Sequence, residues 1–376
     1  MTATIRRAAD FHLVMNVQKG ADPTKTIAAM KFLGQAVVRL PSAISDGEYA
    51  QPLALAKAGM KLIIHHNGWE GEAMLLKQLG YTLALETAVP GCIMAIQGPN
   101  EVNNNPQQWI INGVLVQDTE AQTVAQHRAA MAVTAFIIAW VAQQPVFTGR
   151  DVIMHTDDTP PPALPGAIVD IHTYNNNPKD GAVDWYNVID ALNHLKATNP
   201  NLSTFAISET GVMNADPAKL ALLVCKALMS GIQSGAKYIG LYCLQDNASQ
   251  TYGLFDTNWN PKPAATAAAA LMALLKDTGA NAATFTPKAI TPTLSDPHNL
   301  VQQVLIAFSN GTFLWFWSYW DAETAVTLGY GMPQAGTFKE VFGGSAPVSV
   351  GPWAAKAADT WLKYTGPLVG VLIKPS

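Results

Sequence analysis

Short apolar segments alternate with segments of helical spacing over most of the chain. These segments are apolar throughout rather than at every second position, which is typical of strands buried on both faces of a parallel sheet. Eight of them predict strands, at residues 11–17, 36–41, 61–66, 93–98, 151–156, 167–174, 204–209 and 237–246. Apolar residues spaced three and four apart predict helices between them, among them 47–57, 70–79, 120–143, 185–197 and 217–234.

Eight strand–helix units in about 250 residues predict a closed (β/α)8 barrel, or TIM barrel, rather than an open sheet. After an alanine-rich helix over 264–275 the pattern changes. From residue 282 onward, β-rich runs are broken by glycine, proline and Asn310-Gly311, which predicts a small all-β unit. We therefore expect an α/β barrel over residues 1–278 and a β-sandwich over 279–376, and we interpret the second as a structural appendage rather than a sugar-binding module.

Composition narrows the possible partners. The chain has 376 residues, of which 49% are hydrophobic and only 13% charged, and its net charge is -4. There is no basic field for nucleic acid or an anionic membrane surface, and no apolar run approaches the roughly 20 residues that span a bilayer. The first residues lack the apolar core and cleavage site of a secretory signal. We expect a secreted or periplasmic protein if a signal was removed before this numbering, and a cytoplasmic one otherwise; the sequence leaves the oligomeric state open.

The three cysteines are far apart, each within an apolar run. Their odd number and wide spacing, at Cys92, Cys225 and Cys243, support neither a disulfide framework nor a zinc motif. We expect buried free thiols.

Polar residues gather where the predicted strands end, which is where barrel enzymes carry their chemistry. They are Arg39, His65, His66, Asn67, Asn100, Glu101, His155, His172, Tyr174, Glu209, Gln245 and Asp246. A single glutamate at a strand end is more often a solvated loop residue or the partner of an arginine. Glutamates at the ends of the fourth and seventh strands together point to a catalytic pair.

Asn100-Glu101 after the fourth strand and Ser208-Glu209-Thr210-Gly211 after the seventh resemble the paired signatures of the clan A retaining glycoside hydrolases, the 4/7 superfamily. Arg39 is similar to that clan's second-strand arginine, His172-Thr173-Tyr174 to its sixth-strand aromatic motif, and residues 252–265 to its segment leading into the last barrel helix. The C-terminal unit resembles the sandwich appended in the family 39 β-xylosidase-like enzymes. One departure is that residues 242–246 contain no tryptophan, which the clan often has after the eighth strand.

The resemblance implies hydrolysis of β-glycosidic bonds in an oligo- or polysaccharide, with Glu101 as acid/base, Glu209 as nucleophile, and neither cofactor nor metal. Retention requires two carboxyl groups about 5 to 5.5 Å apart. Glu101 then needs a raised pKa, tuned by Asn100 and His172, while Arg39 and Tyr174 are expected to keep Glu209 ionised.

Further residues are candidates for holding the sugar. His66, Asn100, His172, Tyr174 and Gln245 lie at strand ends, and Trp69, Trp109, Trp185 and Trp259 could stack on sugar faces. The asparagines at 103–105 and 175–177 could bind hydroxyls, although turns and helix caps explain them equally well. No run of lysine or arginine lines these loops, which disfavours a strongly anionic polymer.

Two alternatives stay open. Histidines at several strand ends, with Glu101 and Asp246, are similar to the metal ligands of amidohydrolase barrels, but the first strand, Val14 to Gln18, lacks the His-x-His that such a site needs. A non-catalytic carbohydrate-binding barrel is disfavoured because both glutamates and Arg39 are present.

Overall fold

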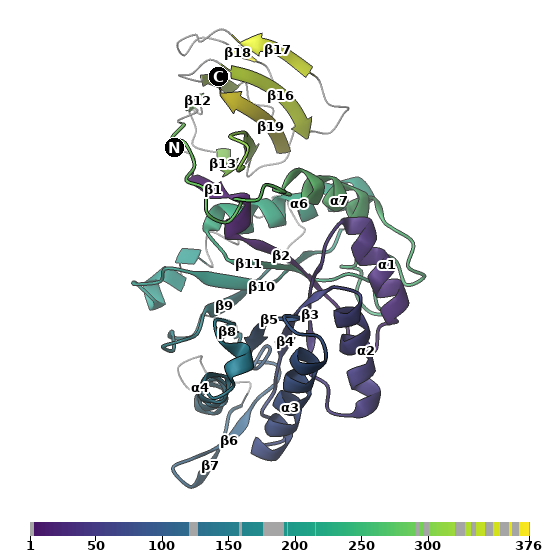
Figure 1. Cartoon of the computed structure of the whole chain (residues 1–376), viewed down its shortest axis with the longest axis vertical. Coiled ribbons are helices and arrows are strands. Elements are labelled where there is room, and N and C mark those ends of the chain that lie inside the picture. Colours follow the sequence, from purple (N-terminus) through teal and green to yellow (C-terminus); the bar gives the residue numbers. More distant parts are fainter. Residues whose placement is uncertain are drawn as a thin grey trace.

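The computed structural model describes residues 4–119, 127–157, 160–175, 192–193, 195–214, 216–290, 293–295, 301–319, 328–331, 336–342, 349–353, 361–362 and 368–375. Figure 1 shows a barrel of strands and surrounding helices, with the C-terminal strands beyond α6 and α7.

The barrel is built from eight strands. They are β2 (His12–Asn16), β3 (Val37–Pro41), β4 (Lys61–His65), β5 (Ile93–Gln97), β8 (Asp151–Ile153), β9 (Val169–Asn175), β10 (Phe205–Val212) and β11 (Tyr238–Leu241). Neighbours pair in parallel in the order β8-β5-β4-β3-β2-β11-β10-β9. The ring closes where Ile153 bridges Ile168, just ahead of β9. The predicted (β/α)8 barrel is confirmed.

Helices cover the outside of the strands (Figure 1). They are α1 (Pro23–Leu33), α2 (Asp46–Lys57), α3 (Glu72–Ala88), α4 (Arg128–Ala142), α6 (Pro217–Ser234) and α7 (Pro263–Leu274). The α6 helix matches its predicted range because both ends carry clear signals: Asp216 accepts hydrogen bonds from the first turn, and Gly235 ends the helix in the left-handed region. Among the described residues, no helix is both long and apolar enough to cross a membrane.

Several boundaries differ from the prediction. The helix expected over 120–143 begins at Arg128, and a hairpin precedes it, formed by β6 (Gln108–Ile111) and β7 (Val114–Gln117). The Asn112-Gly113 turn, with both φ values positive, is typical of such a hairpin. The helix predicted over 70–79 continues to Ala88, and the α1 helix was not predicted. Most of the helix predicted over 185–197 lies outside the described residues.

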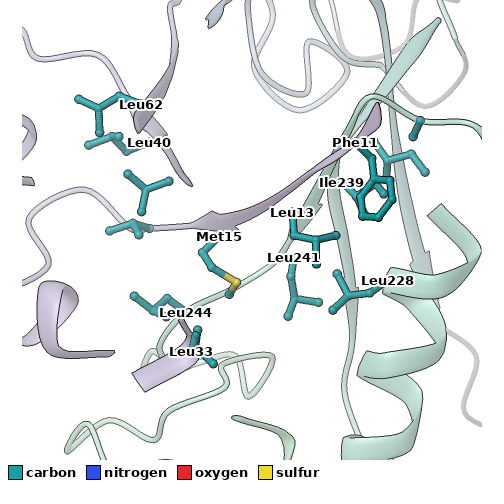
Figure 2. Packing of buried hydrophobic residues seen from close by; sticks show 14 of the residues in the cluster. Phe11, Leu13, Met15, Leu33, Leu40, Leu62, Leu228, Ile239, Leu241 and Leu244 are labelled. Atoms are coloured by element: carbon teal, nitrogen blue, oxygen red, sulfur yellow. The ribbon is translucent and has the colours of Figure 1, made fainter. Parts of the chain in front are cut away.

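The strands are apolar on both faces because each face packs against protein. Figure 2 shows Leu13 and Met15 of β2 packed with Leu228 of α6 and Leu33 of α1, on the layer between strands and helices. A second cluster fills the barrel interior; its members are Val14, Ile63, Ala95, Ile153, Ile168, Ala206 and Tyr238. The three cysteines are buried free thiols, as expected.

Inward-facing positions alternate along a strand, so the interior cluster fixes which polar side chains lie above it. Two residues beyond its members come Asn16, His65, Gln97, Asp170 and Ser208; the first three are the last residues of β2, β4 and β5, and the other two lie within β9 and β10. The barrel therefore places a ring of polar groups directly on an apolar core.

The C-terminal strands form two sheets. The larger has the order β1-β13-β14-β19-β16-β17, from β1 (Thr4–Arg7), β13 (Val301–Ala307), β14 (Phe313–Tyr319), β19 (Leu368–Pro375), β16 (Gly336–Phe342) and β17 (Ser349–Trp353). The smaller contains β12 (Thr293–Ser295), β15 (Leu328–Gly331) and β18 (Trp361–Leu362). Their arrangement as a β-sandwich and the boundary at 278/279 stay predictions.

The first strand belongs to the C-terminal sheet rather than to the barrel, because β1 pairs with β13. Arg6 fixes this strand to the barrel. Its guanidinium donates to the carbonyl oxygens of Ile232 and Ala236 at the end of α6, at 2.8 and 2.9 Å. A cation there also complements the helix dipole. Phe313, Trp315 and Phe316 of the neighbouring β14 are fully buried.

Candidate active site

A cavity of about 280 Å³ lies at the carboxyl ends of the strands. It is lined by Asn100, Glu101, Tyr174, Glu209, Tyr242, Gln250 and Tyr252. Both predicted catalytic glutamates therefore face the same cavity. Glu209 reaches it because the register of β10 shifts between Ile207 and Glu209, so that Ser208 and Glu209 both turn toward the interior.

Arg39 holds Glu209 in place. Its Nη1 lies 2.5 Å from Glu209 Oε1, and both side chains are almost fully buried. The Tyr174 hydroxyl donates to the other carboxylate oxygen, Oε2. Glu209 therefore has a cation on one oxygen and a hydroxyl donor on the other, as the sequence predicted.

The same guanidinium binds three neutral acceptors. Nε donates to Gln97 Oε1 at 2.6 Å, Nη1 to Asn16 Oδ1 at 2.7 Å, and Nη2 to Asn100 Oδ1. Sequence reasoning missed Asn16 and Gln97. Their signal is visible, since each is the single polar residue near the end of an otherwise apolar strand.

Glu101 occupies a tight turn directly after β5. Its φ of 46° is in the left-handed region, which is uncommon for a residue with a side chain. The Thr156 hydroxyl accepts its backbone N–H at 2.7 Å, and its carbonyl accepts from the backbone of Asn104 and Asn105 at 2.9 and 2.7 Å. The asparagine-rich loop thus fixes the glutamate by closing a turn around it.

The side chain of Glu101 pairs with His172. His172 Nδ1 lies 3.0 Å from Glu101 Oε1 and 3.8 Å from Glu209 Oε2. The hydrogen bond from His172 lowers the pKa of Glu101 and outweighs the opposing effect of burial. Burial alone lowers the pKa of His172, but Glu209, Glu101 and Asp170 together raise it above its ordinary value. The expected rise in the pKa of Glu101 is therefore wrong for the free protein, because its neighbour favours the carboxylate.

A buried chain of hydrogen bonds supports His172 from behind. Its Nε2 lies 3.0 Å from the hydroxyl of Ser208, which donates to Asp170 Oδ2 at 2.6 Å. Gln97 also donates to that oxygen at 2.6 Å, which links the chain to Arg39. Burial raises the pKa of Asp170 to about 6, against the influence of His172 and Arg39. Neither Ser208 nor Asp170 was predicted to serve the site as a support for His172.

Three tyrosines form one wall of the cavity. The ring centroids of Tyr174, Tyr242 and Tyr252 lie 5.5 to 5.9 Å apart in edge-to-face contacts. Gly211 allows them to meet, because a Cβ there would lie 2.5 Å from the Tyr242 carbonyl oxygen and 3.1 Å from the Tyr252 ring. Tyr242, directly after β11, supplies an aromatic ring where the sequence has no tryptophan.

His66 faces away from the cavity, contrary to the prediction. Its ring is fully buried, with Nδ1 at 3.1 Å from the Gln97 carbonyl and Nε2 at 2.9 Å from the Thr82 hydroxyl of α3. Burial lowers its pKa to about 4, so it is a neutral packing residue. His65, the residue before it, faces the rim instead.

The other predicted sugar-binding residues lie outside this cavity or outside the described residues. Gln245 donates to the Thr257 carbonyl at 3.0 Å, and Trp259 packs on Phe255 with ring centroids 6.5 Å apart; neither lines the cavity. Trp109 is buried in the core, and Trp185 is outside the described residues. Trp69 is 44% exposed and lines a neighbouring cavity.

One group of side chains in the described part of the chain is close enough to hold a metal ion. It consists of Glu101, His172 and Glu209, whose candidate ligand atoms lie within 4.8 Å of one another. His65, His66 and His155 are not part of it. The strand-end histidines therefore do not converge on one site as the amidohydrolase alternative requires.

Comparison with known proteins identifies the fold. No family model matches the sequence, and no curated protein matches it. The structure resembles a family 30 subfamily 8 xylanase from Clostridium acetobutylicum, with a TM-score of 0.55 and 12% identity over 98% of this chain and 99% of that one. It also resembles a family 51 arabinofuranosidase from Xanthomonas axonopodis pv. citri, with a TM-score of 0.55 and 9% identity over 100% and 97% of the two chains.

A monomeric β-xylosidase from Caulobacter crescentus CB15 is similar as well, with a TM-score of 0.51 and 10% identity over 100% and 98% of the two chains. At these identities the likeness establishes the fold alone. The chain has the (β/α)8 barrel that these glycoside hydrolases share.

Replacing Arg39 with methionine tests the network around the guanidinium. In Arg39→Met, Glu209 becomes a buried charge without a cation, so we expect the free energy of unfolding to fall by about 3–5 kcal/mol. Glu209→Gln alone should cost less, because Arg39 keeps its three amide acceptors. Adding Glu209→Gln to Arg39→Met should recover part of the loss, which urea unfolding of all four proteins measures. Simple additivity of the two single effects would contradict this account.

Proposed function

We propose that this protein is a retaining β-glycoside hydrolase, with Glu209 as the nucleophile and Glu101 as the acid/base. The observation that carries the proposal is the spacing of the two carboxylates across the cavity, with oxygens within 4.8 Å of each other. Retaining enzymes hold their carboxyl groups about 5–5.5 Å apart, whereas inverting enzymes leave about 6.5–9.5 Å for a water molecule. The spacing supports the retaining class.

The different surroundings of the two glutamates support their roles. Glu209 is 5% exposed, and both of its oxygens accept hydrogen bonds from side chains that fix the carboxylate in one orientation. A nucleophile needs this, because it must point at the anomeric carbon. Glu101 is more exposed: His172 binds Oε1 at 3.0 Å, and Asn104 donates only a long hydrogen bond to Oε2, at 3.4 Å. Its carboxyl group is therefore able to meet the leaving group and, later, water.

The proton for the first step is stored between Glu101 and His172. Ser208 donates its single hydrogen to Asp170, so it accepts one from His172 Nε2. With Nε2 protonated, one further proton lies between His172 Nδ1 and Glu101. The pair is either imidazolium with carboxylate or neutral imidazole with carboxylic acid, and the lowered pKa of Glu101 favours the first form in the free protein.

The reaction then proceeds in two balanced steps. Glu209 attacks the anomeric carbon while Glu101, drawing on the stored proton, protonates the departing glycosidic oxygen. Water then attacks the same carbon, its proton returns to the Glu101–His172 pair, and the bond to Glu209 breaks. Asn100, whose oxygen is held by Arg39, is placed beside both glutamates, where its amide nitrogen can bind a sugar hydroxyl.

Removing each glutamate separates the two roles. On the best aryl β-glycoside from a screen, Glu101→Gln and Glu209→Gln should each lose activity by about a thousand-fold or more, and the thermal midpoint of Glu101→Gln should change little. With Glu101→Ala, azide should restore turnover and give the β-glycosyl azide, because the glycosyl–enzyme still forms. With Glu209→Ala, azide can only attack the substrate directly and give the α-azide.

The azide products decide between the assignments. A retained β-azide from Glu209→Ala would mean that the two roles are exchanged. Wild-type turnover in either glutamine variant would exclude a double displacement through these residues. Activity that depends on added zinc would favour a metal-dependent hydrolase built on Glu101, His172 and Glu209.

Ser208 tests the stored proton. Ser208→Ala removes the acceptor of His172 Nε2–H, which disfavours the imidazolium and lets the pair lose its proton at lower pH. The alkaline limb of the kcat/KM profile should therefore move to lower pH by about one unit, the size expected for a lost hydrogen bond to a charged group. Ser208→Thr keeps the hydroxyl and should keep the limb. If Ser208→Ala lowered kcat/KM by the same factor at every pH and left the alkaline limb in place, that result would contradict the shared proton.

A further inference from the structure

A second cavity of about 280 Å³ adjoins the catalytic one at the ends of β3 and β4. The residues that matter in its wall are Pro41, His65, Asn67, Trp69, Asn100 and Asn105. Asn100 also lines the catalytic cavity, so the two share a wall. Each alone is at the small end of the roughly 300–1,000 Å³ of ligand pockets, whereas together they form an extended site.

Trp69 gives this cavity an exposed aromatic face. It lies on the loop between β4 and α3 and is 44% exposed, although an indole normally buries most of its surface. Gly68 before it donates its N–H to Gln107 Oε1 at 2.6 Å, which anchors the loop to the segment that follows Glu101. The ring is thus presented to solvent by a loop tied to the active site.

The polar groups of this wall are held in position by the protein. Gln78 of α3 is 2% exposed. Its side-chain oxygen accepts hydrogen bonds from the Ser42 hydroxyl at 2.8 Å and from the Asn67 backbone N–H at 3.0 Å, and its nitrogen donates to the Asn67 carbonyl at 3.2 Å. Asn105 donates to the carbonyls of Asn100 and Glu101, each at 3.3 Å. These fixed amides suit hydroxyl groups, which both donate and accept hydrogen bonds.

Two side chains still have unused hydrogen-bonding groups. Within the described ranges, the Asn67 amide nitrogen has no protein acceptor, and the ring of His65, which lines the cavity, makes no hydrogen bond. His65 Nδ1 is buried, so the other ring nitrogen, Nε2, is the one that a ligand could reach. Burial, together with Arg39, His66 and His172, lowers the pKa of His65 well below its ordinary value, so the ring is neutral. The accessible nitrogen of a neutral imidazole either donates or accepts one hydrogen bond, and a hydroxyl group can meet it in both cases.

Charge on this wall disfavours an ionic ligand. Its two charged residues have opposite signs, Lys19 and Glu70, and Lys19 already pairs with Glu48 at 2.8 Å. An aromatic face beside fixed neutral amides is the chemistry of an uncharged polyhydroxylated ring.

We propose that the Trp69 cavity is a second sugar subsite, so that the substrate is a neutral oligo- or polysaccharide that spans both cavities rather than a simple monosaccharide glycoside. This inference rests on the proposed function for the chemistry but adds the length of the substrate. Trp69 stacks on one ring while Asn67, His65 and Asn105 bind its hydroxyls, and Asn100 lies between this ring and the one that reacts.

The experiment measures binding and hydrolysis as a function of chain length. Glu209→Gln, which holds uncleaved substrate, is titrated calorimetrically with xylo-, cello- and manno-oligosaccharides of one to four units. Affinity for the accepted series should rise by about ten-fold, or about 1.4 kcal/mol, when the second ring is added, because that ring stacks on Trp69. Adding Trp69→Ala should abolish the increase, and Trp69→Phe should retain part of it.

The matched control is Phe32→Ala, which removes a similarly exposed ring, 47% exposed, from α1 outside both cavities. It should leave the dependence on chain length unchanged. In the active enzyme, Trp69→Ala should lower kcat/KM for the tetrasaccharide by about ten-fold, whereas Phe32→Ala should leave it within two-fold.

The possible failures are distinguishable. Hydrolysis of aryl monoglycosides without any binding that depends on Trp69 would overturn the second subsite and leave the proposed function standing. Binding of oligosaccharides through Trp69 without any cleavage would support the subsite and overturn the hydrolase. No binding of any of the three series would overturn the inference as well.

Discussion

The site depends on one buried cation. Arg39 is 2% exposed and sits on the apolar interior of the barrel, where an unpaired charge would be very costly. It binds one carboxylate, that of Glu209, and the amide oxygens of Asn16, Gln97 and Asn100. These acceptors come from the ends of β2 and β5, from the middle of β10 and from the loop after β5. A single guanidinium therefore fixes the relative positions of half the barrel's rim, and with it the carboxylate of Glu209.

The second glutamate is controlled by a different network. His172 connects Glu101 to Ser208 and, through it, to Asp170, and Gln97 joins this chain to Arg39. The two carboxylates thus belong to one hydrogen-bonded framework, but their hydrogen bonds differ. Glu209 is bound on both oxygens, whereas Glu101 shares a proton with a histidine and keeps access to the cavity. In our proposal this difference separates nucleophile from acid/base.

Much of the site's arrangement could be predicted from the sequence, because the carboxyl ends of parallel barrel strands all lie on one rim. The strand positions followed from where each apolar run stops. The resemblance to clan A implied Arg39 beside Glu209 and Tyr174 as its hydroxyl donor, and the structure has both contacts. Which of the two histidines, His65 or His66, faces the barrel interior could not be predicted in this way. Strands buried on both faces show no alternation, so the sequence alone does not say which of two adjacent histidines faces inward. The interior packing of Ile63 settles it in favour of His65.

Other features depended on contacts between distant segments. Tyr242 and Tyr252 meet Tyr174 only because the chain leaves the sheet after Leu241 and passes over Gly211. The role of acid led us to expect a raised pKa for Glu101, tuned by Asn100 and His172. The hydrogen bond from His172 and its charge lower that pKa instead, against the effect of burial, and the charge on His172 depends on Glu209 across the cavity. Burial and charge act in opposite directions here, and only the geometry shows which effect is larger.

The central claim is that Glu209 attacks the anomeric carbon directly, and the configuration of the first product tests it most directly. Proton NMR, started within seconds of mixing enzyme and an accepted β-glycoside, follows the anomeric signals before mutarotation mixes them. Double displacement through Glu209 predicts that the β-anomer of the released sugar appears first and the α-anomer only later. Initial formation of the α-anomer would show a single displacement by water and would contradict the account.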